Sequence, residues 1–208
     1  MPDYQIKCWD ADSFDFDSVP FVKQAYNEKK WAFVADYVRL YALYTEGGIY
    51  LDSDVRTFKS FDSFLYNDFF IGTEPLPNNC VELESAIMGA IKGHPYVKEC
   101  LDYYRQINFR KENGEIFATC PIIMTSIAEK YGYVAKDENQ LLEANIQVYS
   151  RKYFGHLWGT NPGQLYAIHY FNASWLESKH GWLYRYCKQN DFMRFYFIST
   201  KFLKKFKK

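Results

Sequence analysis

The chain has 208 residues, of which 48% are hydrophobic and 24% are charged, and its formal net charge is zero. These values are those of an ordinary globular protein, and the length suits one domain with a sizeable core. A neutral chain has no bulk preference for nucleic acid, and no run approaches the roughly 18 apolar residues that a membrane-spanning helix needs. The five cysteines are scattered without a C-x-x-C pair, which indicates reduced thiols rather than a disulfide framework.

Two short elements are expected at the start of the chain. Residues 4–9 alternate between polar and apolar side chains, which is typical of a β-strand. An acidic loop at residues 10–17 follows, and residues 21–26 predict a short helix. The first residues show neither the basic nor the apolar region of a signal peptide, so we expect a cytoplasmic protein.

The next helix, expected from residue 34 to residue 46, carries the first candidate site residues. Good helix formers dominate it, and the residues that recur at spacings of three to four are Val34, Val38, Tyr41 and Thr45. Asp36 and Arg39 are three residues apart and therefore share one side of this helix. They place a carboxylate and a guanidinium next to each other.

A break and a strand follow this helix. Gly47 and Gly48 are expected to end it, because glycine suits the left-handed position after a helix. Residues 49–51 then predict a short buried strand that runs into the sequence DSD at residues 52–54. If the chain stays extended there, the two aspartates point to the same side, and such carboxylates repel each other unless a cation joins them. Oxygen ligands favour Mg²⁺, Mn²⁺ or Ca²⁺, and a solvated turn is the alternative interpretation of so short a motif.

Strands and helices are expected to alternate in the remainder of the chain. The predicted strands cover residues 68–73, 85–90, 148–154 and 164–171. Predicted helices begin at Pro95 and Pro121, since proline suits the first helical position, and extend to about Gln106 and Tyr131. This alternation indicates an α/β fold with a mostly parallel central sheet, and ligands of such sheets bind at the carboxyl ends of strands, where residues 52–54 lie.

The C-terminal residues differ from the rest in composition. We expect one domain over residues 1–190 and a basic, aromatic tail over residues 191–208. From Arg194 onward the tail holds six basic residues and no acidic one, with aromatic rings between them. This composition suits peripheral contact with the anionic inner face of the cell membrane, and a solvated terminus is the alternative. Nucleic acid is not an expected partner.

One extended pattern is far more specific than the tripeptide alone. A-D-x-x-R-x-x-x-L-Y-x-x-G-G-I-Y-x-D-x-D spans Ala35 to Asp54. It resembles the DXD-containing sugar transferases of glycosyltransferase family 32, which include bacterial capsule-type transferases and yeast mannosyltransferases. The glucosylating domains of large clostridial toxins share this core motif. Further similarity lies in KGHP at residues 92–95, in residues 121–125 and in residues 167–175.

The resemblance implies a GT-A-like nucleotide-sugar-binding fold and an activity. The activity is that of a metal-dependent, retaining glycosyltransferase of the hexosyl type, acting in bacterial surface polysaccharide synthesis. The donor is expected to be a UDP- or GDP-sugar, and the acceptor a glycan or a lipid-linked glycan. The divalent cation in such an enzyme neutralises charge that builds on the diphosphate as the glycosidic bond breaks.

The resemblance also implies roles for single residues. Asp52, Asp54 and His169 are the expected ligands of Mn²⁺ or Mg²⁺. Asp36 and Arg39 are expected to hold hydroxyls of the donor sugar, since a guanidinium can fix two neighbouring oxygens. Asp36, Arg39, Asp52 and Asp54 together form the expected catalytic group.

Three more residues are implied contacts of the substrate: Tyr50, Ser174 and Trp175. Ser174 and Trp175 resemble the C-terminal segment of the family that closes over the diphosphate, where an indole N–H is a suitable donor to a phosphate oxygen. Structural interpretations remain open: His169 lies between apolar residues and suits a core position, and Trp175 does so as well. Arg39 with Asp36 is also compatible with a plain helical ion pair, which contributes only tenths of a kcal/mol.

One departure from the family pattern concerns the start of the sequence. Family members usually begin with a strand of the type I-P-K-I-I-H-x-x-W and a helix, whereas here Met1 directly precedes Pro2-Asp3-Tyr4. We therefore expect a chain that keeps the metal and sugar end of the site and has a defective base pocket. A truncated, catalytically impaired transferase homologue, which is a binding protein or a remnant, is one alternative. A haloacid-dehalogenase-type phosphatase is another, although Arg56 stands where that class has Thr or Val.

Overall fold

The computed structural model describes residues 3–10, 12–76, 80–154 and 163–170, which all lie in one compact unit, Met1–Phe171. Ser174, Trp175 and the tail at residues 191–208 lie outside the described residues. The division into a domain over residues 1–190 and a tail therefore stays a prediction. Within the described ranges, no helix has the length and apolar character needed to cross a membrane.

The described elements alternate only in part between helix and strand. The α-helices are α1 (Pro20–Asn27), α2 (Trp31–Glu46), α3 (Pro95–Gln106) and α4 (Cys120–Ala128). The strands are β1 (Gly48–Leu51), β2 (Val55–Thr57), β3 (Phe69–Pro75), β4 (Val81–Ala90), β5 (Gln140–Leu142), β6 (Ile146–Tyr149) and β7 (Ala167–His169). Single 3₁₀ turns cover Phe16–Ser18, Asp62–Phe64, Glu129–Tyr131 and Glu143–Asn145.

The central sheet is mixed and mostly antiparallel, so the expectation of a mostly parallel sheet was wrong. Five strands pair in the order β1-β4-β3-β6-β5, and among these pairs only β3 with β6 is parallel. The reason lies in the connections. β3 and β4 are joined by the short segment 76–80, and a parallel pair needs a crossover of a dozen or more residues. A separate antiparallel ladder joins β2 to β7.

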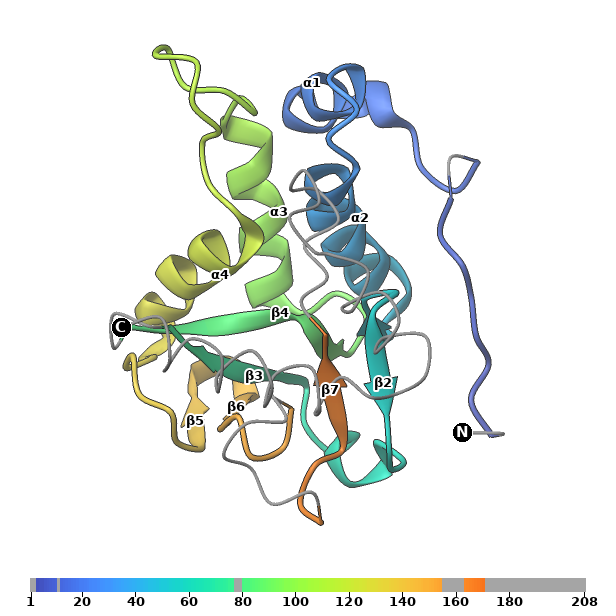
Figure 1. The fold of residues 1–208 in the computed structure, drawn as a ribbon, viewed down its shortest axis with the longest axis vertical. Helices are drawn as coiled ribbons and strands as arrows, with labels where there is room; N and C mark the ends of the chain where they lie inside the picture. Colours follow the sequence, from blue (N-terminus) through green and yellow to red (C-terminus); the bar gives the residue numbers. More distant parts are fainter. Residues whose placement is uncertain (1–2, 11, 77–79, 155–162, 171–208) are drawn as a thin grey trace, which may run out of the picture. The chain divides into compact units, whose positions relative to one another are not determined.

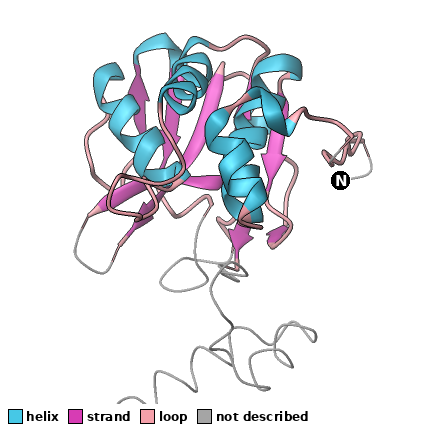
Figure 2. Cartoon of the chain, turned by 90° about the horizontal axis from the view of Figure 1, so that it is seen from above, coloured by secondary structure: helices cyan, strands magenta, loops and turns pink. Residues whose placement is uncertain are grey.

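Each face of the sheet packs on its own apolar cluster. Alternate side chains of β3 point to opposite faces, so Phe69 and Ile71 join the helices while Phe70 joins a second cluster. That second cluster is aromatic and includes Phe61, Phe64, Phe70, Tyr149 and Phe154. Figure 1 shows the four helices on one side of β3 and β4, and Figure 2, turned by 90°, shows the same helices in front of the strands. The site described below lies where β1 and β4 meet the β2–β7 ladder.

Most helices and buried strands fall close to their predicted positions, whereas the strand expected at residues 4–9 is absent. Those residues are described, and they pair with no strand. Their side chains are mostly exposed, with Ile6 88% exposed. Alternation of polar and apolar residues predicts a strand only where a neighbouring strand can take up its hydrogen bonds. The helix α2, which carries Asp36 and Arg39, is confirmed and begins three residues earlier than expected.

Gly89 in β4 should tolerate no larger residue. A Cβ built there would lie 2.1 Å from Cε1 of Phe70, and that ring packs against the rings of Phe61 and Phe154. We expect Gly89→Ala to lower the free energy of unfolding by about 1–3 kcal/mol in urea titrations, because the ring has no free volume to enter. Gly72→Ala is the matched control, since its nearest neighbour would be Cβ of Phe154 at 3.2 Å. Equal losses in the two variants would contradict this packing argument.

Candidate functional site

Two glycines control how α2 delivers the chain to β1. Gly47 and Gly48 have φ angles of 75° and 106°, a region that side chains with a Cβ rarely adopt. A Cβ on Gly47 would also lie 2.8 Å from the backbone nitrogen of Lys92. The N–H of Gly47 donates to the carbonyl of Leu43 at 2.9 Å and ends the helix. The chain therefore reverses within two residues, which brings β1 back beside the face of α2 that carries Asp36 and Arg39.

The D-x-D sequence forms a turn and not the end of an extended strand. The N–H of Val55 donates to the carbonyl of Asp52 at 3.0 Å, which closes a four-residue turn between β1 and β2. The N–H of Asp52 donates to the carbonyl of Ala86 at 2.9 Å and ties the turn to β4. The chain therefore does not stay extended at residues 52–54, which was the condition for both carboxylates to share one face of a strand. Residues on opposite arms of a turn can still face a common point.

Arg39 is buried beneath this turn. Its exposed fraction is 5%, and its Nη2 lies 3.0 Å from Oδ1 of Asp36. Nη1 donates to the carbonyl of Ser85 at 2.9 Å and lies 3.3 Å from Oδ2 of Asp52. Nε donates to the carbonyl of Ala35 at 3.2 Å. The guanidinium therefore links α2, β4 and the turn, and the pair with Asp36 is more than an exposed helical ion pair.

Tyr50 adds a second restraint on Asp52. The phenol donates to Oδ1 of Asp52 at 2.5 Å, so both carboxylate oxygens of Asp52 are engaged. The Tyr50 ring also lies 4.9 Å from Cζ of Arg39, at the distance of a cation–π contact. Burial raises the pKa of the Tyr50 phenol, which favours the protonated form that donates to Asp52. These contacts fix the direction of the Asp52 side chain.

Asp36 is also buried, with an exposed fraction of 8%. Burial raises the pKa of its carboxyl to about 6, although the nearby Arg39 guanidinium favours the ionised form. Its Oδ2 accepts from the backbone N–H of Cys120, the first residue of α4, at 3.2 Å. A carboxylate at a helix N-terminus is stabilised by the helix dipole. Asp36 thus connects two helices to Arg39.

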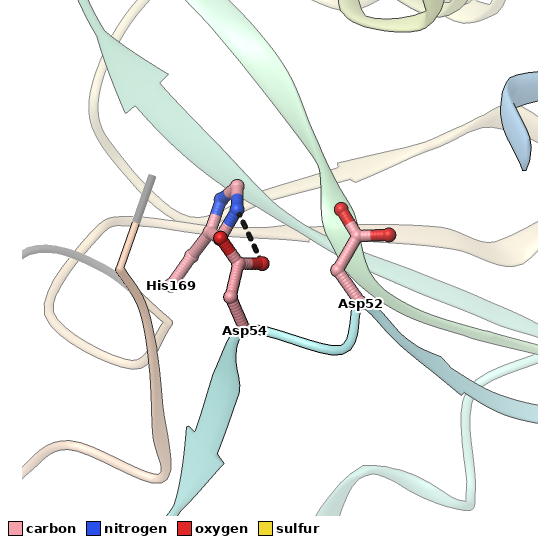
Figure 3. Close-up of side chains that lie close together, drawn as sticks. All are labelled: Asp52, Asp54 and His169. Atoms are coloured by element: carbon pink, nitrogen blue, oxygen red, sulfur yellow. Dashed lines mark ion pairs between the residues drawn. The ribbon is translucent and has the colours of Figure 1, made fainter. Parts of the chain in front are cut away.

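The β2–β7 ladder brings His169 to Asp54. Val55 pairs with His169 in this ladder, and the N–H of Tyr170 donates to the carbonyl of Asp54 at 3.1 Å. Nε2 of His169 lies 3.1 Å from Oδ1 of Asp54. Figure 3 shows the carboxylate of Asp54 directed at the imidazole, with Asp52 at the other arm of the turn. The segments expected to hold a metal are therefore adjacent although they are far apart in the sequence.

Asp52, Asp54 and His169 together form a group with the chemistry of a divalent-cation site. One ligand atom from each lies within 4.8 Å of the others, and all three residues are half-buried. Two carboxylates and one imidazole are a donor set that suits Mn²⁺, and Mg²⁺ accepts the carboxylates. Burial disfavours the His169 imidazolium, but hydrogen bonds to Asp54 and Glu84 outweigh burial and raise its pKa to about 10. The two carboxylates on either side of the ring therefore favour a positive charge at this position.

Glu84 in β4 is a site residue that the sequence did not reveal. Its exposed fraction is 4%, and Oε1 lies 3.2 Å from Nδ1 of His169. β4 departs from its regular pairing with β3 here, because Ile71 faces Met88 while Gly72 faces Glu84. Bulges of this kind are frequent next to active sites. The one sequence signal was a charged pair, Glu82 and Glu84, directly before an apolar run.

Glu74 is a second acidic group close to this carboxylate. Burial, with a contribution from Glu84, raises the pKa of Glu74 to about 7. Glu74 pairs with Glu82 across the β3–β4 ladder. The edge of the site next to His169 is therefore strongly acidic, which suits a cation.

The chain's first residues match a known family. Residues 1–71 match the family described as "Glycosyltransferase sugar-binding region containing DXD motif". The matched region contains α2, β1, the D-x-D turn and β2. The resemblance that the sequence pattern indicated is thereby confirmed.

Two individual proteins show similarity over longer stretches. Inositol phosphoceramide mannosyltransferase 3 of Schizosaccharomyces pombe (strain 972 / ATCC 24843) is 25% identical in an alignment of 191 residues, and the match covers 82% of this chain and 52% of the yeast protein. The chain thus spans about half the length of this curated relative. Among solved structures, the PaToxG glycosyltransferase is similar with a TM-score of 0.41 and 22% identity, over 58% of this chain and 44% of that chain.

Six of the eight residues expected in the site lie in the described part of the structure and are brought together there. They are Asp36, Arg39, Tyr50, Asp52, Asp54 and His169. Ser174 and Trp175 lie outside the described residues, so their contact with a substrate stays a prediction. The roles of all eight are taken up as proposals below.

Proposed function

We propose that this chain is a metal-dependent, retaining glycosyltransferase on a GT-A-like domain, which transfers a hexose from a nucleoside diphosphate sugar to a glycan or lipid-linked glycan. The observation that supports the proposal is the convergence of Asp52, Asp54 and His169 within 4.8 Å, on a segment that matches the DXD sugar-binding region. A role in bacterial surface polysaccharide synthesis, with the tail at residues 191–208 on the membrane, extends the same proposal.

The proposed metal centre consists of Asp52, Asp54 and His169. A divalent cation bound there supplies positive charge to the diphosphate leaving group. Oδ1 of Asp54 and Nε2 of His169 lie 3.1 Å apart, and both are proposed ligand atoms of the cation. Asp52 has fewer free positions, because Tyr50 and Arg39 hold its two oxygens, and this orients its remaining lone pairs.

The proposed donor-sugar site begins at Asp36 and Arg39. Because Arg39 is buried and contacts Asp36, Asp52 and Ser85, we assign it mainly to holding these groups in place. Asp36, with an exposed side-chain fraction of 11%, then presents an oriented carboxylate to sugar hydroxyls. Ser174 and Trp175 are proposed donors to the diphosphate from the C-terminal segment.

The activity test uses the full chain with a panel of UDP- and GDP-sugars. The yeast relative is named a mannosyltransferase, which puts a mannose donor first in the panel. We expect slow release of nucleoside diphosphate in the presence of Mn²⁺, since water can replace a missing acceptor. EDTA should abolish this release and added Mn²⁺ or Mg²⁺ should restore it. Release that persists in EDTA, or no release from any donor, would refute the proposed function.

A further inference from the structure

Glu84 places a buried carboxyl group in β4, next to His169. Oε1 accepts from the backbone N–H of Ala86 at 3.0 Å and contacts Nδ1 of His169, while Oε2 has no hydrogen-bond partner in the described part of the chain. Burying a carboxylate with half of its acceptor capacity unused is costly. A glutamine would accept from the same N–H at a lower desolvation cost. The contact with His169 is a reason for a carboxylate, and not an amide, at position 84.

His169 presents its two ring nitrogens to two different carboxylates. Nδ1 lies 3.2 Å from Oε1 of Glu84, and Nε2 lies 3.1 Å from Oδ1 of Asp54. A neutral imidazole has one N–H and one lone pair, and an ionised carboxylate can only accept. When His169 is neutral, Glu84 therefore favours the N–H on Nδ1 and leaves the lone pair on Nε2. That lone pair is on the nitrogen that faces Asp54.

The backbone fixes both partners of this contact. His169 is held by its pairing with Val55 in the β2–β7 ladder. Glu84 stands at the irregularity in β4, and Ser85 next to it supplies the carbonyl that binds Arg39. The exposed side-chain fractions of Glu84 and His169 are 5% and 14%, so water has little access to their contact. A contact between two such restrained groups can set the direction of the imidazole ring.

We propose that Glu84 is a positioning residue, which holds the His169 imidazole in the Nδ1–H tautomer and so directs Nε2 at a divalent cation shared with Asp52 and Asp54. The inference rests on the proposed function, because it presupposes the cation. Glu84 acts only through His169 and contacts neither the cation nor the sugar donor. Carboxylates behind metal-binding histidines typically change metal affinity by about 10- to 100-fold.

The first test measures Mn²⁺ affinity without any sugar donor. The full chain is titrated with Mn²⁺, and free Mn²⁺ is counted by electron paramagnetic resonance. We expect Glu84→Gln to weaken binding by about 10- to 100-fold. Glu99→Gln is the control, because Glu99 is a half-buried carboxylate on α3 that pairs with Lys130 and lies outside the site. The control should leave the affinity unchanged.

A double-mutant cycle separates positioning from a general structural effect. If Glu84 acts through His169, Glu84→Gln should cause no further loss of Mn²⁺ affinity in a His169→Ala background, so the two effects are not additive. A general distortion of the site would instead add its full effect in both backgrounds. Additive losses, or an unchanged affinity in Glu84→Gln alone, would overturn the proposal and leave the transferase function standing.

The unmodified protein provides a test that does not depend on a variant folding. Nitrogen-15 NMR reports the tautomer of each histidine ring, and Cd²⁺ serves as a diamagnetic substitute for Mn²⁺. We expect the loaded chain to show His169 with its proton on Nδ1 and the cation on Nε2, and the opposite assignment would overturn the proposal. If the wild-type chain binds neither cation, the metal centre of the proposed function fails together with this inference.

Discussion

Arg39→Met should lower the free energy of unfolding by about 3–5 kcal/mol, the expected loss when one partner of a buried ion pair is removed. The guanidinium is 5% exposed and holds Asp36 at 3.0 Å and the Ser85 carbonyl at 2.9 Å. Without it, the buried Asp36 carboxyl must either keep an uncompensated charge or take up a proton, and both cost stability at neutral pH. Methionine is unbranched and fills a similar path, so the loss reports mainly the missing charge and hydrogen bonds. Urea titration monitored by circular dichroism measures it.

A second ion pair in the same protein provides the control. Asp102 and Arg105 also lie three residues apart on a helix, and their side chains approach to 2.9 Å. Here the side chains are 34% and 53% exposed, so Arg105→Met should cost less than about 1 kcal/mol. Asp36→Asn combined with Arg39→Met should cost less than the sum of the two single changes, because the asparagine removes the stranded charge. Similar losses for Arg39→Met and Arg105→Met would show that burial does not strengthen the Arg39 pair.

The elements predicted best are those with a complete local signal. The helical spacing of residues 34–46, followed by Gly47 and Gly48, determines both the end of α2 and the start of β1. Proline likewise marks where two helices begin, since Pro95 is the first residue of α3 and Pro121 the second residue of α4. Each of these signals lies within a few residues of the structure it specifies. Periodicity and turn chemistry suffice in such cases.

Strand direction and partner choice could not be predicted in this way. The strand expected at residues 85–90 is the second half of β4, which begins at Val81 and forms a hairpin with β3. The Pro/Asn-rich segment between them is a short loop, but its composition does not say whether the chain returns to the same sheet. The parallel pair of β3 with β6 joins segments more than 70 residues apart. Such pairings depend on which apolar faces meet in three dimensions, and no local pattern reports this.

The candidate site also has one part with a local sequence signal and one part that depends on long-range contacts. The tripeptide indicated a cation site at Asp52 and Asp54 only as an alternative to a solvated turn, and the helix before it placed Asp36 and Arg39 on one side. The roles of these residues in a site came from the family resemblance. His169 was expected only through a family resemblance, and the structure places it by the β2–β7 ladder. Glu84 escaped notice because its importance arises from a bulge in β4 and from a residue 85 positions later. Long-range contacts therefore account for the part of the site that the sequence alone did not reveal.

Asp54→Asn should cause the largest loss of activity in the proposed transferase. Asparagine keeps the size of the side chain and can still accept from His169, but it removes the negative charge beside the proposed cation. We expect cation-dependent release of nucleoside diphosphate to fall by about 10²- to 10³-fold, as when one group that stabilises transition-state charge is deleted. Mn²⁺ affinity should fall in parallel, since the same charge attracts the cation.

Two comparisons make the Asp54 result decisive. Asp17→Asn is the control for the loss of one acidic charge, since Asp17 has a side chain that is 76% exposed and lies outside the site. Its activity should match that of the wild type. Asp52→Asn distinguishes the transferase from a phosphatase that uses the first aspartate of D-x-D as its nucleophile. Release of phosphate that depends on Asp52, with no turnover of any nucleotide-sugar and no effect of Asp54→Asn on Mn²⁺ affinity, would favour the phosphatase. The transferase requires the opposite pattern, because both aspartates then serve one cation and neither forms a bond to phosphorus.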